Sequence, residues 1–236
     1  MPILIEACCG SIDEAIAAQD AGADRIELCA GLPTGGVTPS LGMIRQAKKL
    51  LSIPVVVMVR SKEGAVCPSE AEFQTMLEDI RCSVSEGADQ LIFGCLTPDC
   101  HVDEVRSREM LVTANGIPCA FHRVFDQTPN ISVSLETLIE LGFCRVLTSG
   151  GPFTTVNDGL SGLKNLVSQA KDRITILPGG GVRAHNVEAL AGECGCREVH
   201  FSFRKPSGGI GYGGVVDQAP DPSQITEVRK LLEKFI

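Results

Sequence analysis

The sequence lacks the features of several common protein classes. It contains no long run of lysine and arginine, and its formal net charge is −8, so we do not expect it to bind a nucleic-acid backbone. Its longest strongly apolar stretch, residues 53–59, contains Pro54 and is too short to span a bilayer. The first residues have neither the basic segment nor the long apolar segment of a secretory signal. We therefore expect a cytoplasmic protein that acts without a nucleic-acid or membrane partner.

Cysteine is abundant, with 11 in 236 residues, but the spacings that bind zinc are absent. Neither a CxxC pair nor a combined cysteine and histidine zinc motif occurs anywhere in the chain. The odd count excludes complete internal pairing, and thiols stay reduced in the cytosol. We expect most of the cysteines to be small buried apolar residues, so the question is which of them do chemistry.

Short β-branched segments alternate with longer amphipathic segments along the whole chain. The predicted strands are residues 3–8, 25–29, 55–60, 90–93, 119–122, 145–148, 175–177 and 198–201. The predicted helices are residues 11–21, 41–51, 70–86, 104–115, 134–141, 159–171, 185–190 and 223–235. The strand segments are almost continuously apolar, which indicates burial on both faces, as in parallel α/β sheets.

Eight strand–helix units in 236 residues fit a single-domain (β/α)8 TIM barrel that spans residues 1–236. A doubly wound open sheet is the alternative. That fold usually has a glycine-rich turn after its first strand, where this chain has only Gly10. No break in composition marks a second domain, and residues 207–222, rich in glycine and proline, are predicted to form a long loop before the last helix.

Most of the predicted strands end in polar or reactive side chains. Barrel active sites lie at the carboxyl ends of the strands, so these side chains are expected on one rim. The candidate catalytic residues are Glu6, Glu27, Arg60, His122, Asp126 and His200. Two buried glutamates with separated pKa values would share acid–base work, and Arg25 or Arg60 would offset a buried carboxylate. The sequence does not identify a nucleophile.

Two Glu-x-Cys triplets, residues 6–8 and 27–29, end the first two predicted strands. Side chains alternate along a strand, so the glutamate and the cysteine of each triplet share one face. We expect Cys8 and Cys29 at equal depth on neighbouring strands, where two thiolates would favour a soft ion such as Cu(I). The alternative is that both cysteines are packing residues.

Glycine-rich turns follow the sixth and seventh predicted strands. In barrels, turns near the last strands often bind phosphate together with a helix N-terminus. The candidate anion-binding residues are Ser149, Gly150, Gly179, Gly180, Gly181 and Arg204. The alternative is that the glycines only form tight turns. An anion site would suit a second hypothesis, an enzyme that acts on a small phosphorylated or carboxylated metabolite; no organic cofactor is expected.

A series of motifs occurs in order along the chain. They are residues 6–8 (EAC), 22–29 (GADRIELC), 35–40 (GGVTPS), 53–60 (IPVVVMVR), 93–99 (FGCLTPD), 121–126 (FHRVFD), 147–150 (LTSG) and 178–182 (PGGGV). Together they resemble the CutC family of copper homeostasis proteins, from residue 3 to about residue 204.

The resemblance implies a cytoplasmic, homo-oligomeric TIM barrel linked to copper handling, with no accepted reaction. Cys8 and Cys29 match the family's two Cu(I) cysteines. Residues 60–64 (RSKEG) depart from the usual Arg-Pro-Arg-x-Gly run, and this departure removes one arginine from the rim.

Overall fold

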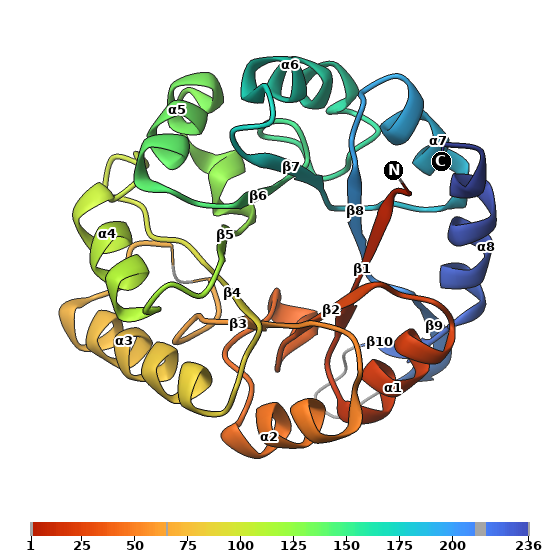
Figure 1. Cartoon of the computed structure of the whole chain (residues 1–236), viewed down its shortest axis with the longest axis horizontal. Coiled ribbons are helices and arrows are strands. Elements are labelled where there is room, and N and C mark those ends of the chain that lie inside the picture. The colour runs from red at the N-terminus through yellow and green to blue at the C-terminus, as the bar shows by residue number, and fades with distance from the viewer. Residues whose placement is uncertain (1, 65, 211–215, 236) are drawn as a thin grey trace.

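The structure is a computed structural model of the chain, and it describes residues 2–64, 66–210 and 216–235. Eight parallel strands form its centre, and helices surround them (Figure 1). The strands are β1 (Leu4–Cys9), β2 (Arg25–Leu28), β3 (Val55–Met58), β4 (Gln90–Phe93), β5 (Cys119–Phe121), β6 (Arg145–Thr148), β7 (Thr175–Pro178) and β8 (Glu198–Phe201).

The helices follow the strands in alternation. They are α1 (Ile12–Asp20), α2 (Leu41–Leu50), α3 (Glu70–Ser85), α4 (Glu104–Thr113), α5 (Ile131–Leu141), α6 (Leu160–Ala170), α7 (Ala184–Gly192) and α8 (Ser223–Leu232). Short 3-10 helices are η1 (Leu32–Thr34), η2 (Arg123–Gln127) and η4 (Glu233–Phe235). In the described part of the chain, no helix has both the length and the apolar character that crossing a bilayer requires.

The strand order is β7-β6-β5-β4-β3-β2-β1-β8, and β8 also contacts β7, so the sheet nearly closes into a cylinder (Figure 1). Every pairing in this sheet is parallel. The order contains no reversal, which a doubly wound sheet would need. The predicted single-domain TIM barrel is therefore confirmed.

Two apolar layers enclose the strands. The larger layer lies between the sheet and the helices and includes Ala7 and Cys9 of β1. The smaller layer lies inside the cylinder and is formed by Cys8, Cys29, Val56, Met58, Ile92, Ala120, Leu147 and Leu177. Burial on both faces of the strands is thus confirmed, and Cys8 belongs to the inner layer.

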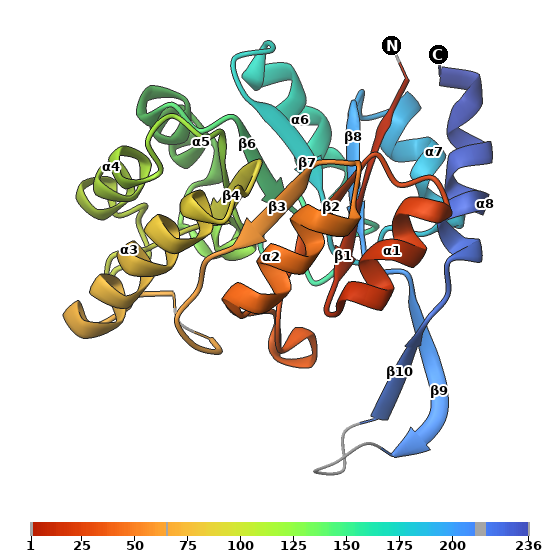
Figure 2. The same ribbon diagram turned by 60° about the horizontal axis from the view of Figure 1, so that its bottom comes forward.

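The long loop predicted at residues 207–222 is wrong for much of its length. The strands β9 (Arg204–Ile210) and β10 (Val216–Pro220) form an antiparallel hairpin that extends away from the barrel (Figure 2). Backbone hydrogen bonds between two strands need no continuous apolar run, which was the pattern that predicted the other strands, and the glycine and proline of this segment favoured a loop. Residues 211–215 of the predicted loop lie outside the described residues.

Helix α5 begins at Ile131, three residues before its predicted start, because Asn130 caps it. The Asn130 side chain accepts hydrogen bonds from the backbone N–H groups of Ser132 and Val133, both at 3.1 Å. An asparagine at this position satisfies donors that the first helical turn leaves free. This cap fixes where the chain turns from η2 into α5, next to the barrel mouth.

Candidate functional site

A cavity of about 1150 Å³ opens at the carboxyl ends of the barrel strands. Most of the predicted site residues line it: Cys8, Glu27, Cys29, Arg60, His122, Asp126, Gly180, Gly181, His200 and Arg204. The predicted residues that do not line it are Glu6, Ser149, Gly150 and Gly179. Parallel strands bring their carboxyl ends to one face, so residues far apart in the sequence meet at this mouth.

The stagger between β1 and β2 decides how the two Glu-x-Cys triplets meet. Glu6 lies opposite Arg25 and Cys8 lies opposite Glu27. Cys29, which directly follows the end of β2, is therefore two residues further along the chain than the residue opposite Cys8. The expected equal depth of the two cysteines is therefore wrong. Closing tilted strands into a barrel requires a shear between neighbours, and the sequence pattern alone does not reveal that shear.

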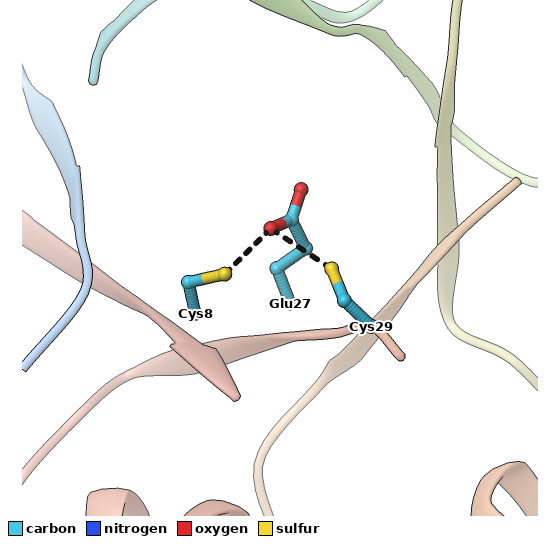
Figure 3. Close-up of side chains that lie close together, drawn as sticks. All are labelled: Cys8, Glu27 and Cys29. Carbon is cyan, nitrogen blue, oxygen red and sulfur yellow. Dashed lines mark hydrogen bonds between the residues drawn. The ribbon is translucent and has the colours of Figure 1, made fainter. Parts of the chain in front are cut away.

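The stagger places the Glu27 carboxyl between the two thiols (Figure 3). Its Oε2 atom lies 3.1 Å from Cys8 Sγ and 3.4 Å from Cys29 Sγ. The two sulfurs and one carboxylate oxygen all lie within 4.8 Å of one another, and all three residues are buried. Two soft sulfur donors and one oxygen, gathered this closely, are a donor set that fits a soft metal ion.

Beside this group, Glu6 is the centre of a buried ion-pair network. Its Oε2 accepts a hydrogen bond from Arg25 Nε at 2.5 Å, and its Oε1 lies 2.7 Å from His200 Nδ1. Arg25 also contacts Glu198 at 2.6 Å, and His200 Nε2 lies 3.8 Å from Glu27 Oε2. The expected pairing of a buried glutamate with Arg25 is confirmed. Glu6 thus orients the imidazole that reaches toward the thiol group.

The two buried glutamates differ in pKa. Burial alone would raise the pKa of Glu6, but Arg25 and the hydrogen bond from His200 hold it well below its usual range. Burial raises the pKa of Glu27 well above its usual value, and the negative charge of Cys8 adds to the effect. The expected separation of these two pKa values is therefore present: Glu6 is a carboxylate, whereas Glu27 favours its protonated form.

The two thiols are also unequal. The adjacent Cys29 thiol and His200 lower the pKa of Cys8 despite its burial, whereas Cys8 and burial raise the pKa of Cys29. Burial alone would lower the pKa of His200, but Glu27, Cys8 and Glu6 raise it well above the usual value. The site therefore favours a thiolate at Cys8 beside an imidazolium at His200. A thiolate is the form of cysteine that binds metals.

The turn after β6 packs against a helix instead of facing the cavity. A Cβ atom at Gly150 would lie 2.2 Å from the carbonyl oxygen of Gly159, next to the start of α6. Ser149 is completely buried, and its Oγ donates a hydrogen bond to Asp126 Oδ2 at 2.7 Å. Here the close approach of two backbone segments accounts for the glycines. Gly180 and Gly181 do line the cavity.

Arg204 lines the cavity but is held by a carboxylate on α1. Its Nη2 contacts Glu14, and its Nη1 lies 3.1 Å from Ser202 Oγ. The arginine beside the glycine turns is Arg123, which the sequence reasoning did not select. A Cβ atom at Gly180 would lie 2.8 Å from Arg123 Nη1. Its position directly after the polar end of β5 was the available signal, whereas Glu14 lies in a helix and the sequence does not point to it as a site residue.

His122 is a neutral imidazole with an assigned tautomer. Its Nδ1 accepts a hydrogen bond from the Val124 backbone N–H at 3.4 Å, which leaves the ring proton on Nε2. Burial, with the charge of Arg60, lowers its pKa to about 4. A Cβ atom at Gly94 would lie 2.9 Å from Nδ1, so the ring packs directly on the backbone there. Arg60 itself donates to the Thr34 carbonyl at 3.2 Å.

Comparison with known proteins gives consistent matches. The CutC family profile matches residues 3–205. The human copper homeostasis protein cutC homolog is 42% identical over 201 residues, which cover 85% of this chain and 73% of the human protein. A family protein CutC from Treponema denticola is 38% identical over 244 residues and 99% of each chain. The crystal structure of a CutC copper homeostasis protein from Streptococcus agalactiae matches with a TM-score of 0.81 and 34% identity, over 84% of this chain and 98% of that one.

Proposed function

The chain belongs to the CutC family, and on that premise we propose that it binds Cu(I) through the thiolates of Cys8 and Cys29 and acts in copper homeostasis. The observation that carries the proposal is the position of both sulfurs against one buried carboxyl oxygen of Glu27. The Cu(I) ion is the cargo of this function.

The local chemistry supports binding of a soft cation. Cys8 already favours its thiolate form, so only the Cys29 thiol has to lose a proton when an ion binds. Glu27 lies beside both sulfurs, and its carboxyl group is available to serve as an oxygen ligand once it has lost its own proton. Thiolates select Cu(I) over hard cations, which prefer oxygen.

We place this function in the cytoplasm and in a homo-oligomer. All eleven cysteines are free, and reducing compartments keep thiols in that state. The oligomeric state stays a prediction, which native mass spectrometry of the purified chain would check.

A Cu(I) titration against a competing chelator tests the copper function. The Cys8→Ser/Cys29→Ser variant should lose more than about 100-fold in affinity, because even residues that only support metal ligands contribute about 10–100-fold. The matched control is Cys67→Ser/Cys82→Ser, which removes two cysteines outside the cavity and should retain the wild-type affinity. Equal Cu(I) affinity in the wild type and the Cys8/Cys29 variant would refute the copper function.

The volume of the cavity favours a second candidate function, an enzyme that acts on a small phosphorylated or carboxylated metabolite. About 1150 Å³ is far more room than one ion needs and matches or exceeds the usual size of a small-molecule pocket. His200, Glu27 and Cys8 would supply acid–base or nucleophilic groups to such a substrate. Screening a metabolite library for turnover by the purified chain tests this candidate, and it should yield a product only when the cavity residues are intact.

A further inference from the structure

Three buried polar atoms that make no hydrogen bond to any described residue belong to residues around the same cavity. They are Nε2 of His122, Nε of Arg60 and Oε1 of Glu27. A buried polar atom without a partner is costly, and folded proteins keep few of them. Two of the three are N–H donors, since the ring proton of His122 is on Nε2.

A metal ion bound by Cys8, Glu27 and Cys29 would not satisfy these donors. A metal cation has no lone pair to offer an N–H group, so a Cu(I) ion between Cys8 and Cys29 would leave both donors unsatisfied. An oxygen atom of an organic molecule would satisfy them. The donors therefore point to a second occupant of the cavity.

The arginines around the cavity set the charge of that occupant. Arg123 and Arg204 each form an ion pair with a carboxylate. Arg60 and Arg183 also line the cavity, but within the described ranges neither forms an ion pair, and the hydrogen bonds of their side chains go to backbone carbonyl groups. Both are about half buried, which lowers their pKa values without neutralising them. Two such cations beside an open cavity favour an anion.

We propose that the cavity binds a small organic oxyanion, a carboxylate or a phosphate ester, whose oxygen accepts hydrogen bonds from His122 Nε2–H and from Arg60. His122 is 5% exposed, and its ring is held between the Val124 N–H group and the backbone of Gly94. Its direction is therefore fixed before the ligand arrives, which lowers the entropy lost on binding. The neutral state of the ring supports its role as a hydrogen-bond donor.

This inference rests on the second candidate function, since it names the class of molecule and the donor atoms that hold it, and it is independent of copper. Calorimetric titration of the full chain without copper tests it with two probes, glycerol 3-phosphate and malonate. The first probe carries a phosphate and the second only carboxylates, so the pair distinguishes the two sources of oxyanion. Saturable binding of at least one probe is expected.

The variants His122→Gln and Arg60→Met should each weaken binding by about tenfold or more, the usual effect of losing one buried hydrogen bond to a charged group. Their matched controls, His101→Gln and Arg81→Met, replace exposed side chains and should stay within about twofold of the wild type. Wild-type affinity in His122→Gln, or no binding of either probe to the wild-type chain, would overturn the inference.

Long-range ¹H–¹⁵N NMR of the wild-type chain gives a second readout that needs no variant. The His122 ring should show a neutral Nε2–H tautomer, and its Nε2 signal should shift as the bound probe accumulates. An Nδ1–H tautomer would overturn the inference. Both readouts measure binding without turnover or copper. If a probe binds as expected but the metabolite screen yields no product, the result would count against the enzyme function and not against this inference.

Discussion

Replacing His122 by glutamine should remove a specific pH dependence from the stability of the fold. Burial lowers the pKa of this imidazole from 6.5 to about 4, so between these values the unfolded chain binds a proton that the folded chain excludes. Stability therefore falls as the pH drops below 6.5, and the loss is complete near pH 4. The full effect is about 3 kcal/mol, from 1.36 kcal/mol for each pKa unit.

The assay compares urea unfolding of the wild type and His122→Gln at pH 7 and pH 5. Other carboxyl and imidazole groups titrate in the same range, but they are common to both proteins and cancel in the difference. The free energy of unfolding of the wild type should fall by about 2 kcal/mol more than that of the variant between these two pH values. The control variant His101→Gln replaces an exposed imidazole, and its free energy of unfolding should fall between the two pH values as much as that of the wild type.

A parallel loss of stability in the wild type and His122→Gln would refute this reasoning. It would mean that the ring takes up its proton in the folded state and donates from both nitrogens. The hydrogen bond from the Val124 backbone N–H to Nδ1 would then be absent. The sign of the difference alone is decisive, because a ring stabilised in its charged form would make acid favour the folded wild type.

Two other substitutions should change the stability of the fold. Gly162→Ala should destabilise the chain by about 1–3 kcal/mol or more in urea unfolding, because its Cβ atom would lie 1.8 Å from the Gly150 carbonyl oxygen, whereas the control Gly42→Ala, in an open helix position, should stabilise it by about 0.5–1 kcal/mol. Equal effects at the two glycines would contradict the close packing of α6. Glu6→Gln should cost about 3–5 kcal/mol in the same assay because it leaves Arg25 without its closest carboxylate, and a loss below about 1 kcal/mol would show that the ion pair is not buried as described.

The fold was largely predictable because its signals are local. Apolar strands and amphipathic helices repeat along the chain, and a parallel barrel has only one simple way to connect them in order. The hairpin of β9 and β10 was missed because it extends away from the barrel (Figure 2). A strand that does not pack on the core needs no continuous apolar run, so the glycine and proline content of this segment predicted a loop.

The membership of the site was predictable, but its contacts were not. The carboxyl ends of the strands brought most of the predicted residues to one cavity, as the direction of the strands requires. The partners of the cationic groups depend on distances across the mouth. Arg204 reaches back to Glu14 on α1, and Arg123 takes the position beside Gly180 that the sequence reasoning had given to Arg204. No spacing within one segment encodes such contacts.

The two Glu-x-Cys triplets show most clearly how the fold assigns different roles to the same local sequence. Had Cys8 stood opposite Cys29, Glu6 would have stood opposite Glu27, and the two triplets would have faced each other directly. The shear instead puts Glu27 beside Cys8, in a buried position where its pKa rises. The same shear puts Glu6 beside Arg25, where it stays ionised and holds His200 in its charged form. The stagger of two residues, imposed by closing the barrel, therefore gives the two copies of the motif different roles. Glu27 favours its protonated form, whereas Glu6 stays charged and pairs with Arg25 and His200.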